Sequence, residues 1–211
     1  MLPYAPGMGL FHRAVITPSK SEIIETWGPS QDWWPDADAP MEVIGAFRFD
    51  DPEGQVGMET HLVRVADVVL QVPLTYRNEP LDGAEAAFIT TTEHTVLGTR
   101  YVYDGTGDPL YLVMLAAVAM TGQGETLGMA MYDGRWYVAP TNVRIEGGGW
   151  SLERVPVDGF EPQGDDVFTN DGFELRFHRL PAAGPRPPMG LSARWDGLAE
   201  PVVVAQVTAL G

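Results

Sequence analysis

The sequence predicts an α+β fold, and three observations lead to this prediction. Residues 41–50 alternate between apolar and polar side chains, as a half-buried strand does, and two further strand-like segments follow. Two other segments, 19–28 and 108–122, carry residues that begin and end helices. The last part, 123–211, reads as short strands separated by turns. With 211 residues, of which 45% are hydrophobic, the chain is expected to form a single domain, 1–211, with its own core.

The first predicted helix has two competing start signals. Thr17 can cap the helix with Pro18 at the first helical position, or Ser19 can cap it and form a capping box with Glu22. In either case the helix is expected to end at Gly28, because glycine favours helix C-termini and the proline that follows does not continue a helix. The sequence therefore predicts one short helix whose start is open between these two alternatives.

Four segments in the first third of the chain have the composition of strands. Residues 11–17 precede the first helix, and 41–50, 55–65 and 68–76 follow it with short turns between them. The last three are therefore expected to form consecutive antiparallel strands. Pro73 has no backbone N–H to donate, so the third of these strands is expected at an edge of the sheet or next to a bulge.

Two more strands and a second helix are expected next. Residues 84–94 and 100–103 are rich in β-branched and aromatic side chains. The helix is expected to begin after Asp108, which can cap it and precedes a proline suited to the first turn, and to end at Gly122. Residues 109–120 contain no charged side chain. A helix that is apolar on all sides is buried, so we expect this helix at the centre of the core.

The last part of the chain gives weaker local signals. Strand-like pieces over 129–138 and 142–145 precede an acidic stretch, 158–166, which is expected to be a loop. Three clearer strands close the chain, at 173–180, 190–197 and 201–210. The order of the strands between residues 123 and 172 is left open.

Composition and charge argue against several classes of partner. The formal charge is −16, with 13 Lys and Arg against 29 Asp and Glu, so nucleic acid and anionic membranes are poor partners. The chain has no cysteine, which fits a reducing compartment. The first residues lack the features of a signal peptide, and the longest apolar run is shorter than the roughly 20 residues that span a bilayer. We therefore expect a soluble, cytoplasmic protein.

None of the motifs that mark common catalytic centres occurs in the sequence. There is no phosphate-binding loop, dinucleotide-binding turn, zinc-protease helix, protein-kinase catalytic-aspartate motif or serine nucleophile elbow. The histidines, His12, His61, His94 and His178, are spread over four predicted strands, a pattern more typical of structural residues than of a metal site. We therefore expect no catalytic residue, no metal and no cofactor.

Polar residues on and between the middle strands are candidates for binding a ligand or a partner. Glu93 precedes His94, and a carboxylate beside a histidine can orient it for acid–base work. Adjacent side chains on a strand point to opposite faces, however, so both can reach one ligand only if a bulge intervenes. The candidates, which include a residue of an Asp-Gly turn, are Tyr76, Arg77, Asp82, Glu93, His94 and Asp104.

Residues 72–113 contain VPLTYRNEPLDGAE and TTEHTVLGTRYVYDGTGDPLYL, and they resemble the N-terminal cap domain of actinobacterial maltokinases and of free-standing proteins built from that cap. FHRAVITPSK and GAFRFDDPEGQVGME are similar to the opening of the same family, so the resemblance covers about 11–122. It implies an α+β cap in which a curved, somewhat cystatin-like antiparallel sheet packs on two helices. Residues 123–211 are then a β-rich C-terminal extension.

In these kinases the cap precedes a catalytic body that holds ATP, magnesium and sugar, and this chain has no match to its catalytic motifs. The resemblance therefore implies a non-catalytic accessory or regulatory module linked to maltose, trehalose and α-glucan (glycogen) metabolism. Its expected partner is a sugar kinase or another enzyme of glucan metabolism. The alternative is a protein that binds a small ligand, a sugar or a nucleotide. A carbohydrate-active enzyme is a third hypothesis, and the oligomeric state is left open.

Overall fold

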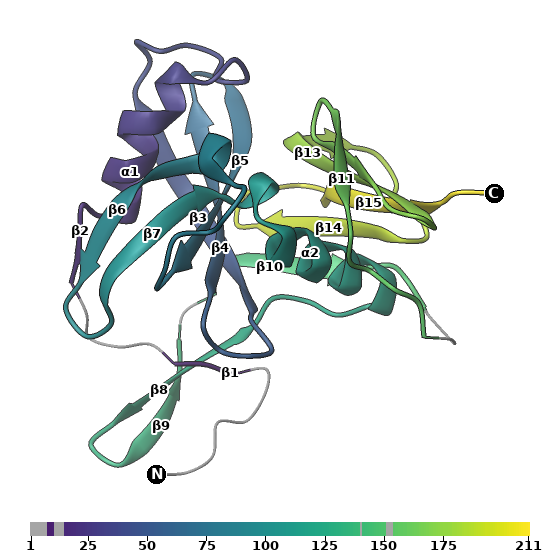
Figure 1. Ribbon diagram of the computed structural model, residues 1–211. Helices are drawn as coiled ribbons and strands as arrows, with labels where there is room; N and C mark the ends of the chain where they lie inside the picture. Colours follow the sequence, from purple (N-terminus) through teal and green to yellow (C-terminus); the bar gives the residue numbers. More distant parts are fainter. Residues whose placement is uncertain (1–7, 11–14, 140, 151–153) are drawn as a thin grey trace.

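The described residues form three antiparallel or mixed sheets and two α-helices, shown in Figure 1. In this computed structural model, the described residues are 8–10, 15–139, 141–150 and 154–211. The purple to teal part of the chain forms one large sheet with a helix on its outer face, and the green to yellow part forms a second large sheet beside it. A third, small sheet projects below the first.

The first large sheet, here called the cap sheet, is antiparallel throughout, in the order β2-β6-β7-β5-β4-β3. Its strands are β2 (Ile16–Thr17), β3 (Met41–Asp50), β4 (Gly57–Val65), β5 (Val68–Arg77), β6 (Phe88–His94) and β7 (Gly98–Asp104). A short 3₁₀ turn, η2 (Glu85–Ala87), leads into β6. The three consecutive antiparallel strands expected from the sequence are confirmed. Of the strand expected over 11–17, residues 11–14 lie outside the described part of the chain.

Pro73 lies in an interior strand, so the expectation of an edge strand or a bulge is wrong. It pairs with Thr60 of β4, and β7 lies on the other side of β5. Pairing with β7 ends at Leu74, which lies opposite Asp104. The missing N–H is tolerated because β7 does not extend alongside Pro73, so no hydrogen bond to that neighbour is lost.

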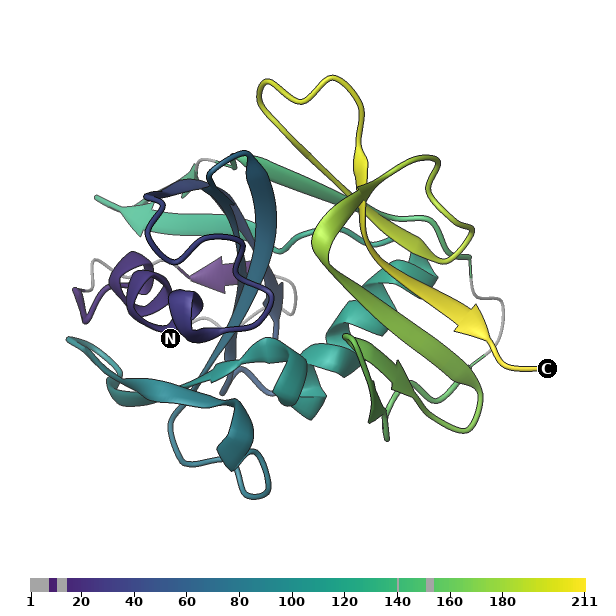
Figure 2. The ribbon, with the colours of Figure 1, turned by 90° about the horizontal axis from the view of Figure 1, so that it is seen from above.

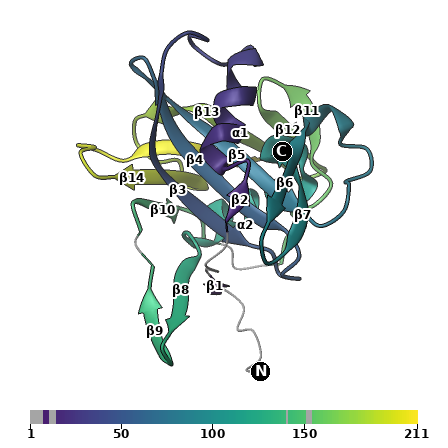
Figure 3. The same ribbon diagram turned by 90° about the vertical axis from the view of Figure 1, so that its left-hand side faces the viewer.

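The first helix, α1 (Lys20–Trp27), begins at the capping box and not at the alternative start with Pro18. The Glu22 N–H donates to Ser19 Oγ at 3.3 Å, and the Ser19 N–H donates to Glu22 Oε2 at 2.7 Å. At its other end the helix passes into a 3₁₀ turn, η1 (Gly28–Ser30). Figure 3 shows α1 lying across the cap sheet. Its buried residues, Ile23 and Ile24, pack there on a cluster that includes Val63, Val65, Leu70 and Val72.

The second helix, α2 (Pro109–Thr121), has the boundaries that the sequence predicts. It follows the 3₁₀ turn η3 (Gly105–Gly107). The Leu110 N–H donates to Asp108 Oδ1 at 3.0 Å, and Gly122 ends the helix at φ 67°, a left-handed conformation that favours glycine. Within the described residues, no helix is long and apolar enough to cross a membrane.

The second large sheet, here called the C-terminal sheet, is antiparallel in the order β10-β14-β15-β13-β12-β11. Its strands are β10 (Val143–Gly147), β11 (Glu161–Gly164), β12 (Val167–Thr169), β13 (Phe173–Ala183), β14 (Gly190–Trp195) and β15 (Val202–Ala209). The stretch 158–166 was expected to be a loop, and that expectation is wrong. This stretch contains β11, which pairs with β12 across a two-residue turn. The last three expected strands are confirmed.

The small sheet has the order β1-β8-β9, with β1 (Met8–Leu10) parallel to β8 (Leu127–Tyr132), and β8 antiparallel to β9 (Arg135–Val138). The hairpin of β8 and β9 stands out from the rest of the molecule in Figures 1 and 3. The Ala139 N–H donates to Gly128 O at 2.9 Å, which extends the pairing of the two strands beyond Val138.

Helix α2 lies between the cap sheet and the C-terminal sheet, as the view from above in Figure 2 shows. Its buried side chains are Tyr111, Leu112, Leu115, Ala116, Val118, Ala119 and Met120. They belong to one cluster with Phe47 and Met58 of the cap sheet and with Leu191 and Val204 of the C-terminal sheet. The expectation that this helix lies at the centre of the core is confirmed.

A buried arginine also joins the two large sheets. Arg179 on β13 is 5% exposed, and its Nη2 lies 3.0 Å from Asp104 Oδ2 of the cap sheet and 3.2 Å from Asp166 Oδ1. Its guanidinium lies 4.5 Å from the ring centroid of Trp33 and 5.1 Å from that of Phe177. Burial alone would lower the pKa of Arg179, but Asp104 and Asp166 together have the larger effect, and the pKa lies above its usual value. Arg179 therefore stays charged.

We predict that Leu115→Ala lowers the free energy of unfolding by about 2 to 5 kcal/mol, because the side chain is fully buried and its loss leaves a cavity. Leu97→Ala is the matched control, since Leu97 is 51% exposed and should cost less than about 1 kcal/mol. His94→Ala and Glu93→Gln should likewise lower the free energy of unfolding by less than about 1 kcal/mol. Urea melts of the four variants measure these differences. A silent Leu115→Ala beside an unfolded His94→Ala would contradict the central position of α2.

Arg179→Met should destabilise the protein by about 3 to 5 kcal/mol, because it leaves Asp104 and Asp166 buried side by side without a counter-charge. Arg176→Met on the same strand provides the comparison. Its side chain is 40% exposed and pairs with Glu174 at the surface, where such pairs contribute less than about 1 kcal/mol. Equal losses in the two variants, measured by thermal or urea unfolding, would show that Arg179 does not join the sheets.

Candidate functional site

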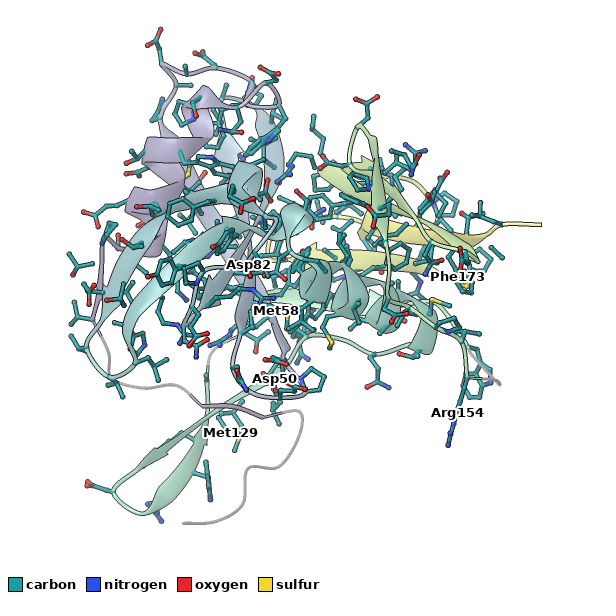
Figure 4. The ribbon with its side chains drawn as sticks, in the orientation of Figure 1. Asp50, Met58, Asp82, Met129, Arg154 and Phe173 are labelled. Carbon is teal, nitrogen blue, oxygen red and sulfur yellow. The ribbon has the colours of Figure 1, made fainter. Side chains whose placement is uncertain are left out.

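A cavity of about 730 Å³ lies at one end of the cap sheet. Its walls come from the start of α1, the ends of β3 and β4 with the loop between them, and the β6–β7 hairpin. Asp50 and Met58, at this end of β3 and β4, are labelled in Figure 4. The cavity is large enough for a small organic ligand, since ligand pockets commonly measure about 300 to 1,000 Å³.

Strand register explains which side chains meet in this cavity. Asp50 pairs with Gly57, and Gly57 pairs with Tyr76, so these three residues form a row across β3, β4 and β5. Arg48 and Glu59 form the next row. Residues that pair directly across strands point to the same face of a sheet. Both rows therefore present their side chains to the face that α1 only partly covers.

Helix α1 closes one side of the cavity through an ion pair. Lys20 Nζ bonds to Glu59 Oε2, and the Lys20 ammonium lies 5.8 Å from the ring centroid of Tyr76. His61 Nε2 lies 4.0 Å from the same Glu59 oxygen, which is too far for a hydrogen bond. A second, smaller cavity of about 270 Å³ also borders Arg48, Glu59 and His61. These polar side chains thus lie between two hollows of the surface.

Burial controls the protonation of this polar group. It pushes the pKa of Glu59 upward, but His61 and Lys20 outweigh it, and the pKa of Glu59 is lowered. Burial lowers the pKa of His61 to about 4, against a smaller opposing effect of Glu59. Burial also raises the pKa of Tyr76 well above its usual value. At neutral pH the group therefore holds a carboxylate, a neutral imidazole and a neutral phenol.

The loop between β3 and β4 forms an ordered rim. The Asp51 carboxylate accepts hydrogen bonds from the backbone N–H groups of Glu53, Gln55 and Val56, at 2.8 to 2.9 Å. Arg100 Nη2 donates to Gln55 O at 2.7 Å and to Tyr76 O at 2.9 Å, which ties this loop to β5. Asp51 and Arg100 are therefore occupied by backbone groups of the rim.

Of the six candidate residues predicted from the sequence, Tyr76 and His94 line the cavity. His94 Nδ1 accepts hydrogen bonds from the N–H groups of Val96 and Leu97, at 3.2 and 3.0 Å, and so shapes the β6–β7 turn. Glu93 points away from the cavity and accepts a hydrogen bond from Thr99 Oγ1 at 2.6 Å. The opposite orientation of these two neighbours agrees with the alternation expected on a strand.

The other three candidates lie elsewhere. Asp82 is exposed in a turn and is labelled in Figure 4, away from Asp50. Arg77, next to Tyr76 but on the opposite face, forms a bidentate pair with Asp108 through Nε at 2.8 Å and Nη2 at 2.7 Å. Asp104 is bound to Arg179. The structure therefore places two of the six candidates in the cavity, one in a surface turn and two in structural ion pairs, while Glu93 lies on the other face of β6, bonded to Thr99.

Several residues of the cavity were missed by the sequence reasoning. They are Lys20, Arg48, Asp50, Glu59 and Arg100. The alternation of 41–50 already places Arg48 and Asp50 on one face, which looks like a solvated face because nothing local shows that α1 folds over it. Lys20 and Glu59 are 39 positions apart, so their pairing has no local signal. Among the described residues, no three His, Asp or Glu side chains are grouped so as to hold a metal ion.

We predict that acid weakens the protein partly through His61. Its pKa is about 4 when folded and near 6.5 when unfolded, so between these values only the unfolded chain binds the proton. Stability is therefore complete above pH 6.5 and falls toward pH 4, by up to about 3 kcal/mol from this group. Melting temperatures from pH 4 to 7 should decrease less for His61→Gln than for the unchanged protein. Parallel curves would contradict the buried, neutral state of His61.

Comparison with known proteins gives one match. No curated protein sequence matches the chain. Residues 27–108 match the family described as the maltokinase N-terminal cap domain, a segment that is less than half of the chain. The match runs from the end of α1 through β7 and includes most of the cap sheet. Residues 27–108 are thus similar to a maltokinase N-terminal cap domain, and this match supports the cap-like domain predicted from the sequence.

Proposed function

We propose that this protein is a non-catalytic accessory or regulatory module that acts on a sugar kinase or on another enzyme of maltose, trehalose or α-glucan metabolism. The match of residues 27–108 to the cap domain of maltokinase is the observation that carries this proposal. Two of the residues that the sequence suggested for the site add support, because Arg77 and Asp104 are held in structural ion pairs with Asp108 and Arg179. Side chains held in such ion pairs stabilise the fold and are not available to act on a substrate.

The β8–β9 hairpin is the surface that best fits contact with a partner protein. Trp136 is 46% exposed and Val138 is 66% exposed, and Leu127 on the neighbouring strand is 52% exposed. Exposed apolar side chains that gather on a projecting element are typical of protein–protein contacts, with tryptophan enriched among the residues that contribute most. A formal charge of −16 favours a partner with a basic surface around that contact.

Affinity capture with the tagged chain tests this proposal. An enzyme of carbohydrate metabolism should be recovered at concentrations at which micromolar binding persists. Trp136→Ser should reduce recovery by about tenfold, because a tryptophan at the centre of an interface commonly contributes more than 1 kcal/mol. Leu180→Ser is the control, since Leu180 is 52% exposed but lies on β13. Recovery of no carbohydrate-metabolism protein would overturn the proposal.

A second candidate function, binding of a small ligand, is favoured by the cavity of about 730 Å³ with Tyr76 in its wall. The third hypothesis, a carbohydrate-active enzyme, has less support. Such chemistry generally needs two carboxylates that face each other, about 5 to 9.5 Å apart. Of the three carboxylates in this cavity, Asp51 and Glu59 are instead engaged by backbone N–H groups and by Lys20, which leaves Asp50 without a second available carboxylate. A cytoplasmic location and a cystatin-like cap remain predictions.

A further inference from the structure

We propose that the cavity at the end of the cap sheet binds an uncharged ligand rich in hydroxyl groups, of the chemical class of mono- and disaccharides. The proposal rests on the second candidate function, ligand binding. It does not depend on the accessory role and would stand or fall separately from it. Three features of the cavity carry it: two polar atoms without partners, a gap between them, and a lining with balanced charge.

The proposal uses two particular buried polar atoms of the lining, for which the described residues supply no hydrogen-bond partner. They are Tyr76 Oη and Asp50 Oδ2, and Tyr76 as a whole is only 8% exposed. A buried polar group without a partner costs about 1 to 3 kcal/mol, so such groups are usually satisfied by protein, water or a ligand. A ligand that bonds to both atoms would recover this free energy.

The gap between these atoms is created by a glycine. Gly57 lies between Asp50 and Tyr76 in the same cross-strand row. Neighbouring strands are about 4.8 Å apart, so the two residues are separated by about two strand spacings. A Cβ added at Gly57 would lie 3.5 Å from Tyr76 Cβ, which is ordinary contact on the same face. The glycine therefore leaves room where any larger side chain would occupy the floor of the cavity.

Charge balance selects a neutral ligand. The lining holds three cationic side chains, Lys20, Arg48 and Arg100, and three carboxylates, Asp50, Asp51 and Glu59. Lys20 pairs with Glu59, and Arg100 donates to two backbone carbonyls. A phosphate or nucleotide needs a surplus of cationic donors, which this lining does not supply. An ammonium ligand would in turn need surplus carboxylates.

The chemistry of the two atoms indicates hydroxyl groups on the ligand. The Tyr76 phenol stays protonated because burial raises its pKa well above the usual value, so it can both donate and accept a hydrogen bond. Burial raises the pKa of Asp50 as well, against hydrogen bonding by Thr126, and its free oxygen accepts from a donor. Sugar hydroxyls both donate and accept, and they match this pair.

Saturation-transfer NMR and titration calorimetry test the proposal, with methyl α-glucoside and maltose as neutral probes and with glucose 6-phosphate and ATP as charged probes. The neutral probes should bind, and the charged probes should bind more weakly. Tyr76→Phe removes only the unpaired hydroxyl and should weaken binding of the neutral probes about tenfold, the value of one good hydrogen bond. Gly57→Val should abolish their binding by filling the gap.

Two further measurements separate a binding role from a structural role. The melting temperature of Tyr76→Phe without ligand should stay unchanged or rise, because an unsatisfied hydroxyl is removed. Tyr111→Phe is the matched control. Its hydroxyl is bonded to Thr60 at 2.7 Å on the opposite face of the sheet, so its loss should lower the melting temperature and leave binding intact.

Three results would overturn the proposal. One is the absence of binding of either neutral probe at concentrations up to about 10 mM, which corresponds to less than about 3 kcal/mol of binding free energy. Another is tighter binding of the charged probes. The third is binding that neither Tyr76→Phe nor Gly57→Val changes, because the ligand would then lie elsewhere. None of these results bears on capture of a partner enzyme by the β8–β9 hairpin.

Discussion

The burial of α2, in which seven of 13 residues are buried, is the constraint on which the rest of the structure depends. A helix of 13 residues without a charged side chain has no face that suits water, and one sheet can cover only one of its sides. The cap sheet covers α2 from one direction, and the C-terminal sheet covers it from the other. The buried contacts of Arg179 with Asp104 and Asp166 then hold the two sheets together at the margin of this core.

The position of the candidate site follows from this arrangement. Because α2 and the C-terminal sheet occupy one face of the cap sheet, the opposite face is left to α1. Helix α1 has only eight residues, and it covers the apolar rows around Val63 and Leu70. The polar rows that contain Glu59 and Tyr76 extend beyond it, and the cavity lies over them. A short helix on a long sheet thus produces both a core and an open, polar pocket.

Much of the fold could be predicted from the sequence, because the signals were local. The capping box of Ser19 and Glu22, the ends of α2 at Asp108 and Gly122, and the strands of the cap sheet depend on residues a few positions apart. The site depends on distant residues, and most of it was not predicted. Lys20 meets Glu59 across 39 positions of sequence, and no local pattern indicates such a contact. Pro73 and β11 were misplaced for the same reason, since their environment is set by where the neighbouring strands end or pair.

If both sheets depend on one helix, neither can unfold alone, and residues 1–211 should behave as a single cooperative unit. Scanning calorimetry of the whole chain tests this dependence most directly. We expect one transition whose calorimetric enthalpy equals the van't Hoff enthalpy, a ratio of about 1, as for a two-state domain. Two separate transitions, or a ratio of about 2, would show that the cap sheet and the C-terminal sheet fold independently and that α2 does not unite them.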